Sequence, residues 1–202
     1  MSDTDLDVLI VQRIADLDDA AKRLTRLEER MGRAMCAVAE AWVEEQGWVG
    51  SYKWPHDLSV APAHWRPEED AWRAWFSLHL AHGDSGAGVG DEDYFTMTRL
   101  LGKGQRTYTL RFDQDTYNKS VIKNISRRTA GRFTGTGFLL DEGSSFVLPF
   151  TIDAEDFVDA IRGGDLSDGL AGYREALNRL PEAISHFDDL LALAAQEVAR
   201  KA

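Results

Sequence analysis

The chain has 202 residues, 44% of them hydrophobic and 28% charged, which suits a folded protein with a buried core and excludes an intrinsically disordered chain. Its first residues are acidic, and no apolar run approaches the roughly 18 residues of a membrane span. We therefore expect no signal peptide, no membrane association and a cytoplasmic location. The net charge of −11 argues against a uniformly basic nucleic-acid-binding protein, and the single cysteine, Cys36, excludes an intramolecular disulfide.

The first 47 residues are expected to form one long amphipathic helix or two helices in tandem. Apolar residues recur every three or four positions, as one face of a helix requires. They are Ile10, Ile14, Leu17, Ala21, Leu24, Leu27, Met31, Ala34, Val38 and Trp42. Gly47 stands where such a helix would end. This apolar stripe needs a cover, which either the C-terminal segment or a second subunit would provide.

The composition changes after Gly47 to tryptophan, proline and histidine. Pro55, Pro62 and Pro67 exclude a continuous helix here and indicate short extended pieces joined by turns. All six tryptophans lie between residues 42 and 75, which favours a core where helices meet a sheet over an exposed stacking platform. Residues 71–82 alternate as a half-buried strand would, which is the preferred interpretation, although a helix also fits their apolar spacing.

The middle of the chain is expected to supply most of the sheet. A short helix starting at Asp91 and ending before Gly102 should precede it. From Arg106 the apolar period is two residues, as in a strand. Two further strands, 132–140 and 145–152, are separated by only four residues, so they should pair as an antiparallel hairpin.

The C-terminal part is expected to be helical. A helix should start at Thr151 or Asp153 and end near Gly163 and Gly164. From Asp168 onward the apolar spacing alternates four and three residues, as in a coiled-coil seam. The seam consists of Tyr173, Leu177, Leu180, Ile184, Phe187, Leu191, Ala194 and Val198. Pro181 falls inside it, which predicts a fresh helix that begins near Leu180.

The charges of the chain are segregated. Residues 99–132 contain nine basic residues and two acids, a local charge of about +7, whereas the remainder carries about −18. The expected anion-binding residues are Lys119, Lys123, Arg127, Arg128 and Arg132. Nearby glycines and threonines would allow a phosphate to approach the backbone closely. The alternative is that these cations pair with the many carboxylates of the chain itself.

Asp113 and Asp115 lie at the end of the strand that starts near Arg106. Being two residues apart, they would project from one face of an extended chain, beside the basic segment. Paired carboxylates of this kind can hold the Mg²⁺ of a phosphodiesterase. However, no acid stands two positions before any lysine, as the common nuclease motif requires, so a turn at the strand end is the preferred interpretation.

Together these patterns predict a single α+β domain over residues 1–202. It combines an N-terminal helix (1–47), a core with an antiparallel sheet of about four to five strands (51–152) and C-terminal helices (153–202). The expected function is non-enzymatic binding, through helical self-association or a helical protein partner and a basic face for nucleic acid or an acidic protein. A Mg²⁺-dependent phosphodiesterase using Asp113 and Asp115 and a purely structural assembly subunit are the alternatives. We expect no cofactor and no bound metal.

Overall fold

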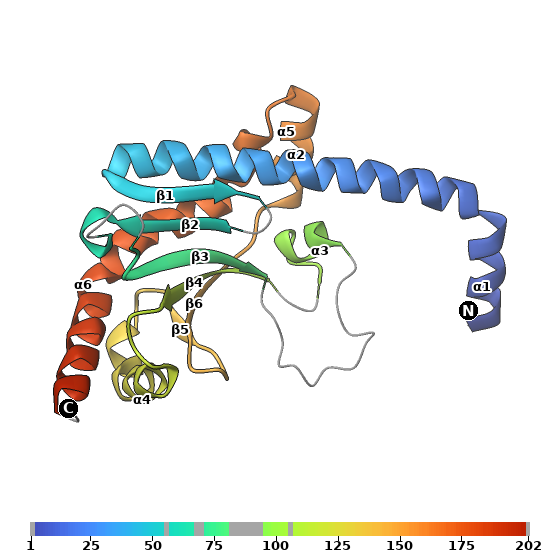
Figure 1. Cartoon of the computed structure of the whole chain (residues 1–202). Helices are drawn as coiled ribbons and strands as arrows, with labels where there is room; N and C mark the ends of the chain where they lie inside the picture. The colour runs from blue at the N-terminus through green and yellow to red at the C-terminus, as the bar shows by residue number, and fades with distance from the viewer. Residues whose placement is uncertain (1–2, 55–56, 67–70, 81–94, 105–106, 201–202) are drawn as a thin grey trace.

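Figure 1 shows the computed structural model, which describes residues 3–54, 57–66, 71–80, 95–104 and 107–200. The helices are α1 (Asp3–Gln12), α2 (Ile14–Gln46), α3 (Thr96–Leu100), α4 (Lys119–Thr129), α5 (Ala154–Gly163) and α6 (Ala171–Ala199). The strands are β1 (Trp48–Lys53), β2 (Asp57–Pro62), β3 (Ala74–Leu80), β4 (Tyr108–Gln114), β5 (Leu139–Leu140) and β6 (Phe146–Phe150). Short 3₁₀ turns are η1 (Ala63–Trp65), η2 (Ala130–Phe133) and η3 (Leu166–Leu170).

The six strands form one antiparallel sheet in the order β1-β2-β3-β4-β6-β5. Helices α2 and α6 pack against it, α2 chiefly along β1 and α6 against β6 (Figure 1). The α+β prediction is confirmed, including the long N-terminal helix and the antiparallel pairing of β5 with β6. The sheet has six strands, whereas four to five were expected, because the proline-rich segment after Gly47 contributes both β1 and β2.

One continuous core joins the helices to the sheet. The predicted seam of α6 is buried at Tyr173, Leu177, Leu180, Phe187, Leu191 and Ala194, so it is closed within the chain. Phe187 stacks on Phe112 of β4 with ring centroids 4.3 Å apart, and the Trp65 indole makes T-shaped contacts with both rings. Trp42 and Trp65 are almost fully buried, which confirms the core interpretation for these two tryptophans.

The N-terminal segment forms two helices in tandem. The break falls at Arg13, where the backbone leaves helical values (φ −116°, ψ 17°). Helix α2 ends at Gly47, which adopts the left-handed conformation that suits a glycine C-cap. From Met31 onward its apolar stripe is buried, whereas the residues before Ala21 are exposed. The body of the protein therefore covers only the second half of this stripe.

Two sequence-based boundaries were wrong. Residues 132–140 were expected to form one strand, but only Leu139 and Leu140 do so. Gly135 and Gly137 take left-handed backbone values, which turn the chain so that Phe133 and Phe138 both enter the core. Pro181 does not begin a new helix, because α6 continues through it.

For residues 74–80 the strand prediction is confirmed, since β3 pairs with β4 over its full length. The predicted cap at Asp91 lies outside the described residues, and the short helix is observed as α3. Within the described ranges, none of the helices combines the length and the apolar character needed to cross a membrane.

Candidate functional site

Helix α4 carries four of the five predicted anion-binding residues on its solvent side. Asn118 caps the helix by accepting a hydrogen bond from the Ser120 N–H at 2.9 Å. Ile125, Ser126 and Thr129 form the buried side, and the helix packs beside α6 (Figure 1). The sequence of α4 contains four cations and no acidic residue. Because the apolar side faces the protein, the cations are directed outward.

The cations of α4 are arranged in a row with one neighbour. Lys119, Lys123 and Arg127 follow each other at four-residue spacing, a rise of about 6 Å per step along the helix axis. Arg128 lies beside the row, and Arg132 follows in η2. All five residues are exposed. We call this set, Lys119, Lys123, Arg127, Arg128 and Arg132, the basic face.

Most of the basic face is not neutralised by the chain itself. Arg132 lies 3.5 Å from Asp189 of α6, and both side chains are more than half exposed, so this ion pair contributes little to stability. Arg127 donates a hydrogen bond from Nε to Ser144 Oγ at 2.8 Å. Among the described residues, the other three cations have no ion pair. Pairing with the chain's own carboxylates therefore accounts for only one of the five cations, Arg132.

The small residues after α4 have structural roles. Thr129 Oγ donates to the Ile125 carbonyl, Thr134 Oγ to that of Gly131 and Thr136 Oγ to that of Phe133. These bonds close the end of α4 and the turn that follows η2. Gly131 and Gly135 have no atoms near the position of a β-carbon, so the backbone there is open to approach.

The structure places Asp113 in a local network on β4. Its Oδ2 accepts a short hydrogen bond from Ser77 of β3, and its Oδ1 lies 2.9 Å from Arg111 Nε. The side chains of Arg111 and Asp113 are 30% and 21% exposed, respectively. Both carboxylate oxygens are thus engaged by groups of the protein itself, which is the pattern of a structural ion pair.

Asp115 is separated from this network. It lies beyond the end of β4, is exposed, and has no hydrogen bond or ion pair with any other described residue. The described part of the chain also contains no group of three or more His, Cys, Asp or Glu residues placed to hold a metal ion. The magnesium-site alternative therefore gains no geometric support from either aspartate.

A row of serines crosses the sheet next to this network, and sequence reasoning missed it. The strand register aligns Ser51 of β1 with Ser59, Ser59 with Ser77 of β3, and Ser77 with Arg111. Asp57 accepts hydrogen bonds from Ser51 and Ser59, each at 2.6 Å. Burial alone would raise the pKa of Asp57, but these two bonds and the charge of Lys53 outweigh it and lower the pKa below its ordinary value.

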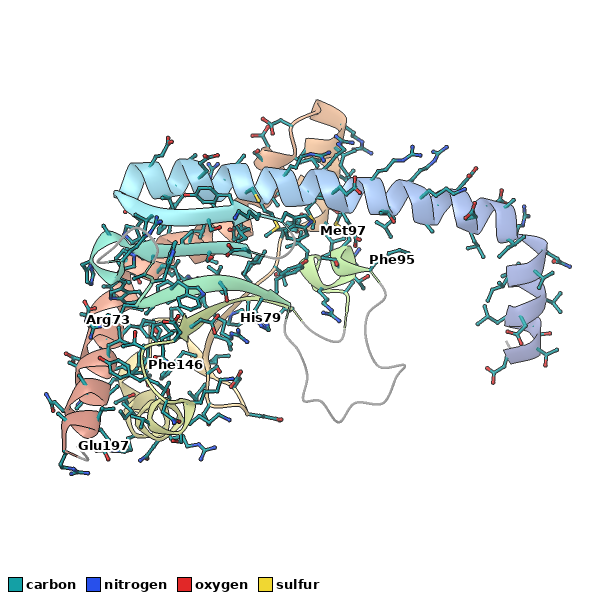
Figure 2. All side chains as sticks on the ribbon, viewed as in Figure 1. Arg73, His79, Phe95, Met97, Phe146 and Glu197 are labelled. Atoms are coloured by element: carbon teal, nitrogen blue, oxygen red, sulfur yellow. The ribbon has the colours of Figure 1, made fainter. Side chains whose placement is uncertain are left out.

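A hollow of about 440 Å³ opens beside this row. It is lined in part by Trp72 and Trp75, whose rings meet edge to face, and the guanidinium of Arg66 lies 5.1 Å from the centroid of the Trp72 ring. In Figure 2, Arg73 lies just before β3 and His79 lies near the end of that strand. Asp57 and Asp115 also line the hollow. Its charges are mixed, in contrast to the uniformly positive basic face.

Comparisons of the chain with protein-family models, with curated proteins and with solved structures found no match.

Proposed function

We propose that this protein is a non-enzymatic binding protein whose basic face engages an anionic partner, with nucleic acid as the first candidate and an acidic protein as the second. The observation that supports it is the solvent side of α4, where Lys119, Lys123 and Arg128 are exposed without a carboxylate partner in the described structure. A cytoplasmic location belongs to the same proposal.

The spacing of the cations suits a chain of phosphates. Three of them follow one line over about 12 Å of helix, and phosphate contacts are made mostly by such lysine and arginine side chains. The rest of the molecule is strongly acidic, so a polyanion would be repelled elsewhere and directed to this face. Catalysis is not part of the proposal, because both oxygens of Asp113 are already engaged by Ser77 and Arg111.

Fluorescence anisotropy with labelled single- and double-stranded oligonucleotides, at low and at physiological salt, tests this proposal. We expect saturable binding that weakens steeply with salt. The variant Lys119→Glu/Lys123→Glu should bind at least about tenfold more weakly and should reduce the salt slope by about two, since each lysine contacts a phosphate. Circular dichroism should show an unchanged fold, because both side chains are exposed.

The matched control is Arg162→Glu/Arg174→Glu, which makes the same charge change at exposed positions of α5 and α6. This variant should bind like the wild type. Equal weakening by both variants would indicate an effect of net charge and contradict a specific face. Absence of oligonucleotide binding at low salt, together with binding of polyglutamate that needs Lys119 and Lys123, would identify an acidic protein as the partner class.

A further inference from the structure

The exposed apolar residues of the protein are concentrated at its N-terminal end. Of the eleven large hydrophobic side chains that are exposed in the described structure, seven lie between Leu6 and Leu17. Figure 1 shows α2 extending well past the sheet, with α1 turned across its far end. We call residues 3–27 the arm. In Figure 2 no other described element lies beside the side chains of its outer part.

The apolar stripe of the arm is the continuation of a covered stripe. Met31, Met35, Val38 and Trp42 of α2 are buried by the body of the protein. The same three- and four-residue spacing continues backward through Leu27, Leu24, Ala21, Leu17 and Ile14. Leu24 is half-buried, Leu17 is 45% exposed and Ile14 is 60% exposed. A second helix that continued along this seam would complete the cover.

The charges of the arm are divided along its length. Residues 3–19 carry six aspartates and one arginine, a net charge of −5. Residues 20–27 carry Lys22, Arg23 and Arg26 and no acid, a net charge of +3. Two arms in parallel would place like charges side by side, whereas antiparallel arms can place the basic residues 20–27 of one copy beside residues 11–18 of the other, which carry a net charge of −1.

We propose that a second copy of this chain covers the arm, and that the two arms pack antiparallel in a dimer. The register follows from the boundary of the charges near Asp19. It places Ile14 level with Leu24 of the second copy and Leu17 level with its Ala21, so that apolar residues meet across the whole contact.

The same register gives α1 a position. It places Gln12, the last residue of α1, level with Arg26 of the second copy, close to the point where that arm joins its body. A membrane surface is a poorer occupant, because helices that lie on lipid carry lysine and arginine beside their apolar face. Here that position is taken by six aspartates.

The association state tests the proposal. Analytical ultracentrifugation of the full chain should give twice the 22.6 kDa of one copy. The variant Ile14→Asp/Leu17→Asp should give the mass of one copy. The control Val158→Asp/Ile161→Asp changes two exposed apolar residues of α5, outside the arm, and should remain dimeric. A wild type of single-copy mass, or a dimer that survives Ile14→Asp/Leu17→Asp, would overturn the proposal.

Cross-linking distinguishes the two directions. In a Cys36→Ala background, a mixture of the Ile14→Cys and Leu24→Cys proteins should form a disulfide between the two variants on mild oxidation. Ile14→Cys alone should not form one. A strong link between two Ile14→Cys copies would show a parallel arrangement and contradict the proposed register.

Two further measurements separate this proposal from its alternatives. Co-sedimentation of the wild type with phosphatidylcholine vesicles, lost in Ile14→Asp/Leu17→Asp, would identify a lipid surface as the occupant and overturn a second copy. The dimer does not depend on anion binding, because the arm and the basic face lie on different elements. Lys119→Glu/Lys123→Glu should remain dimeric, whether or not the wild type binds oligonucleotides.

Discussion

The carbonyl oxygen of Thr151 lies against the α-carbon of Gly172, in the first turn of α6. A β-carbon at residue 172 would overlap with that oxygen and would stand only 3.1 Å from the carbonyl carbon of Thr151. Both obstacles are backbone atoms, so no side-chain rotation can relieve the overlap. This contact fixes the start of α6 beside the chain that leaves β6.

Gly172→Ala should therefore lower the free energy of unfolding by about 1 to 3 kcal/mol, the usual cost of forcing extra volume into a packed site. Urea unfolding of the wild type and the variant measures this change in the free energy of unfolding. Gly163→Ala is the matched control, because residue 163 is also helical and a β-carbon there meets no atom within 4 Å. This control should raise stability by about 0.5 to 1 kcal/mol, since alanine favours a helix more than glycine does. Equal effects at the two positions would contradict the close contact.

Pro181 offers a second test, since it lies inside a continuous α6. Proline has no N–H to donate to the Leu177 carbonyl, and its ring crowds that carbonyl. We expect Pro181→Ala to raise the free energy of unfolding by about 1 to 3 kcal/mol. The upper limit is the full cost of a proline, relative to alanine, in a helix interior. Glu182→Ala, at the next exposed position, should change it by less than about 0.5 kcal/mol. A loss of stability in Pro181→Ala would show that the ring has a packing role.

The parts of the fold that follow from local chemistry could be predicted from the sequence. Asp153 caps α5 by accepting hydrogen bonds from the Glu155 and Asp156 N–H groups, and Gly164 ends the helix in a left-handed conformation. Both signals are contained within the helix and its neighbours. Gly47 ends α2 for the same reason.

The parts that depend on packing could not be predicted in this way. A proline normally ends a helix, but Leu180 and Ala183 on either side of Pro181 are fully buried, and their packing outweighs the local preference. The alternating pattern of residues 132–140 resembled a strand, yet two left-handed glycines redirect the chain there.

The same distinction applies to the polar surfaces: the basic face could be predicted from the sequence, and the serine row could not. The basic face was visible in the sequence because four of its five residues are neighbours along one helix and Arg132 follows a few residues later. The serine row was not visible, because Ser51, Ser59 and Ser77 become neighbours only through the register of three strands. Register is decided by the fold as a whole, so no local pattern marks these residues.

The lowered pKa of Asp57 predicts how the stability of the fold depends on pH. Its pKa is lower in the folded protein than its ordinary value of 3.8, so the ionised carboxylate stabilises the fold. This contribution is fully present above the pKa of the unfolded chain and is lost as the pH falls through the folded value. Asp57→Asn should therefore be less stable than the wild type at pH 7, and the difference should shrink below about pH 4.

The cause of this shift can be tested directly by NMR titration of the Asp57 carboxyl. In Ser51→Ala/Ser59→Ala the hydrogen bonds are lost while most of the burial remains, so the pKa of Asp57 should rise. A pKa in the wild type at or above 3.8 would contradict the stabilising role of the two serines.

Asp113 and Asp115 provide the last test, since they separate a structural role from a catalytic one. Asp113→Asn removes the charge that Arg111 and Ser77 contact, and should lower the free energy of unfolding by about 1 to 2 kcal/mol. Asp115→Asn, at an exposed position without a partner among the described residues, should change it by less than about 0.5 kcal/mol. Neither variant should alter oligonucleotide affinity, because neither residue belongs to the basic face. Hydrolysis of an oligonucleotide by the wild type that requires Mg²⁺ and is lost in both variants would instead establish the phosphodiesterase alternative.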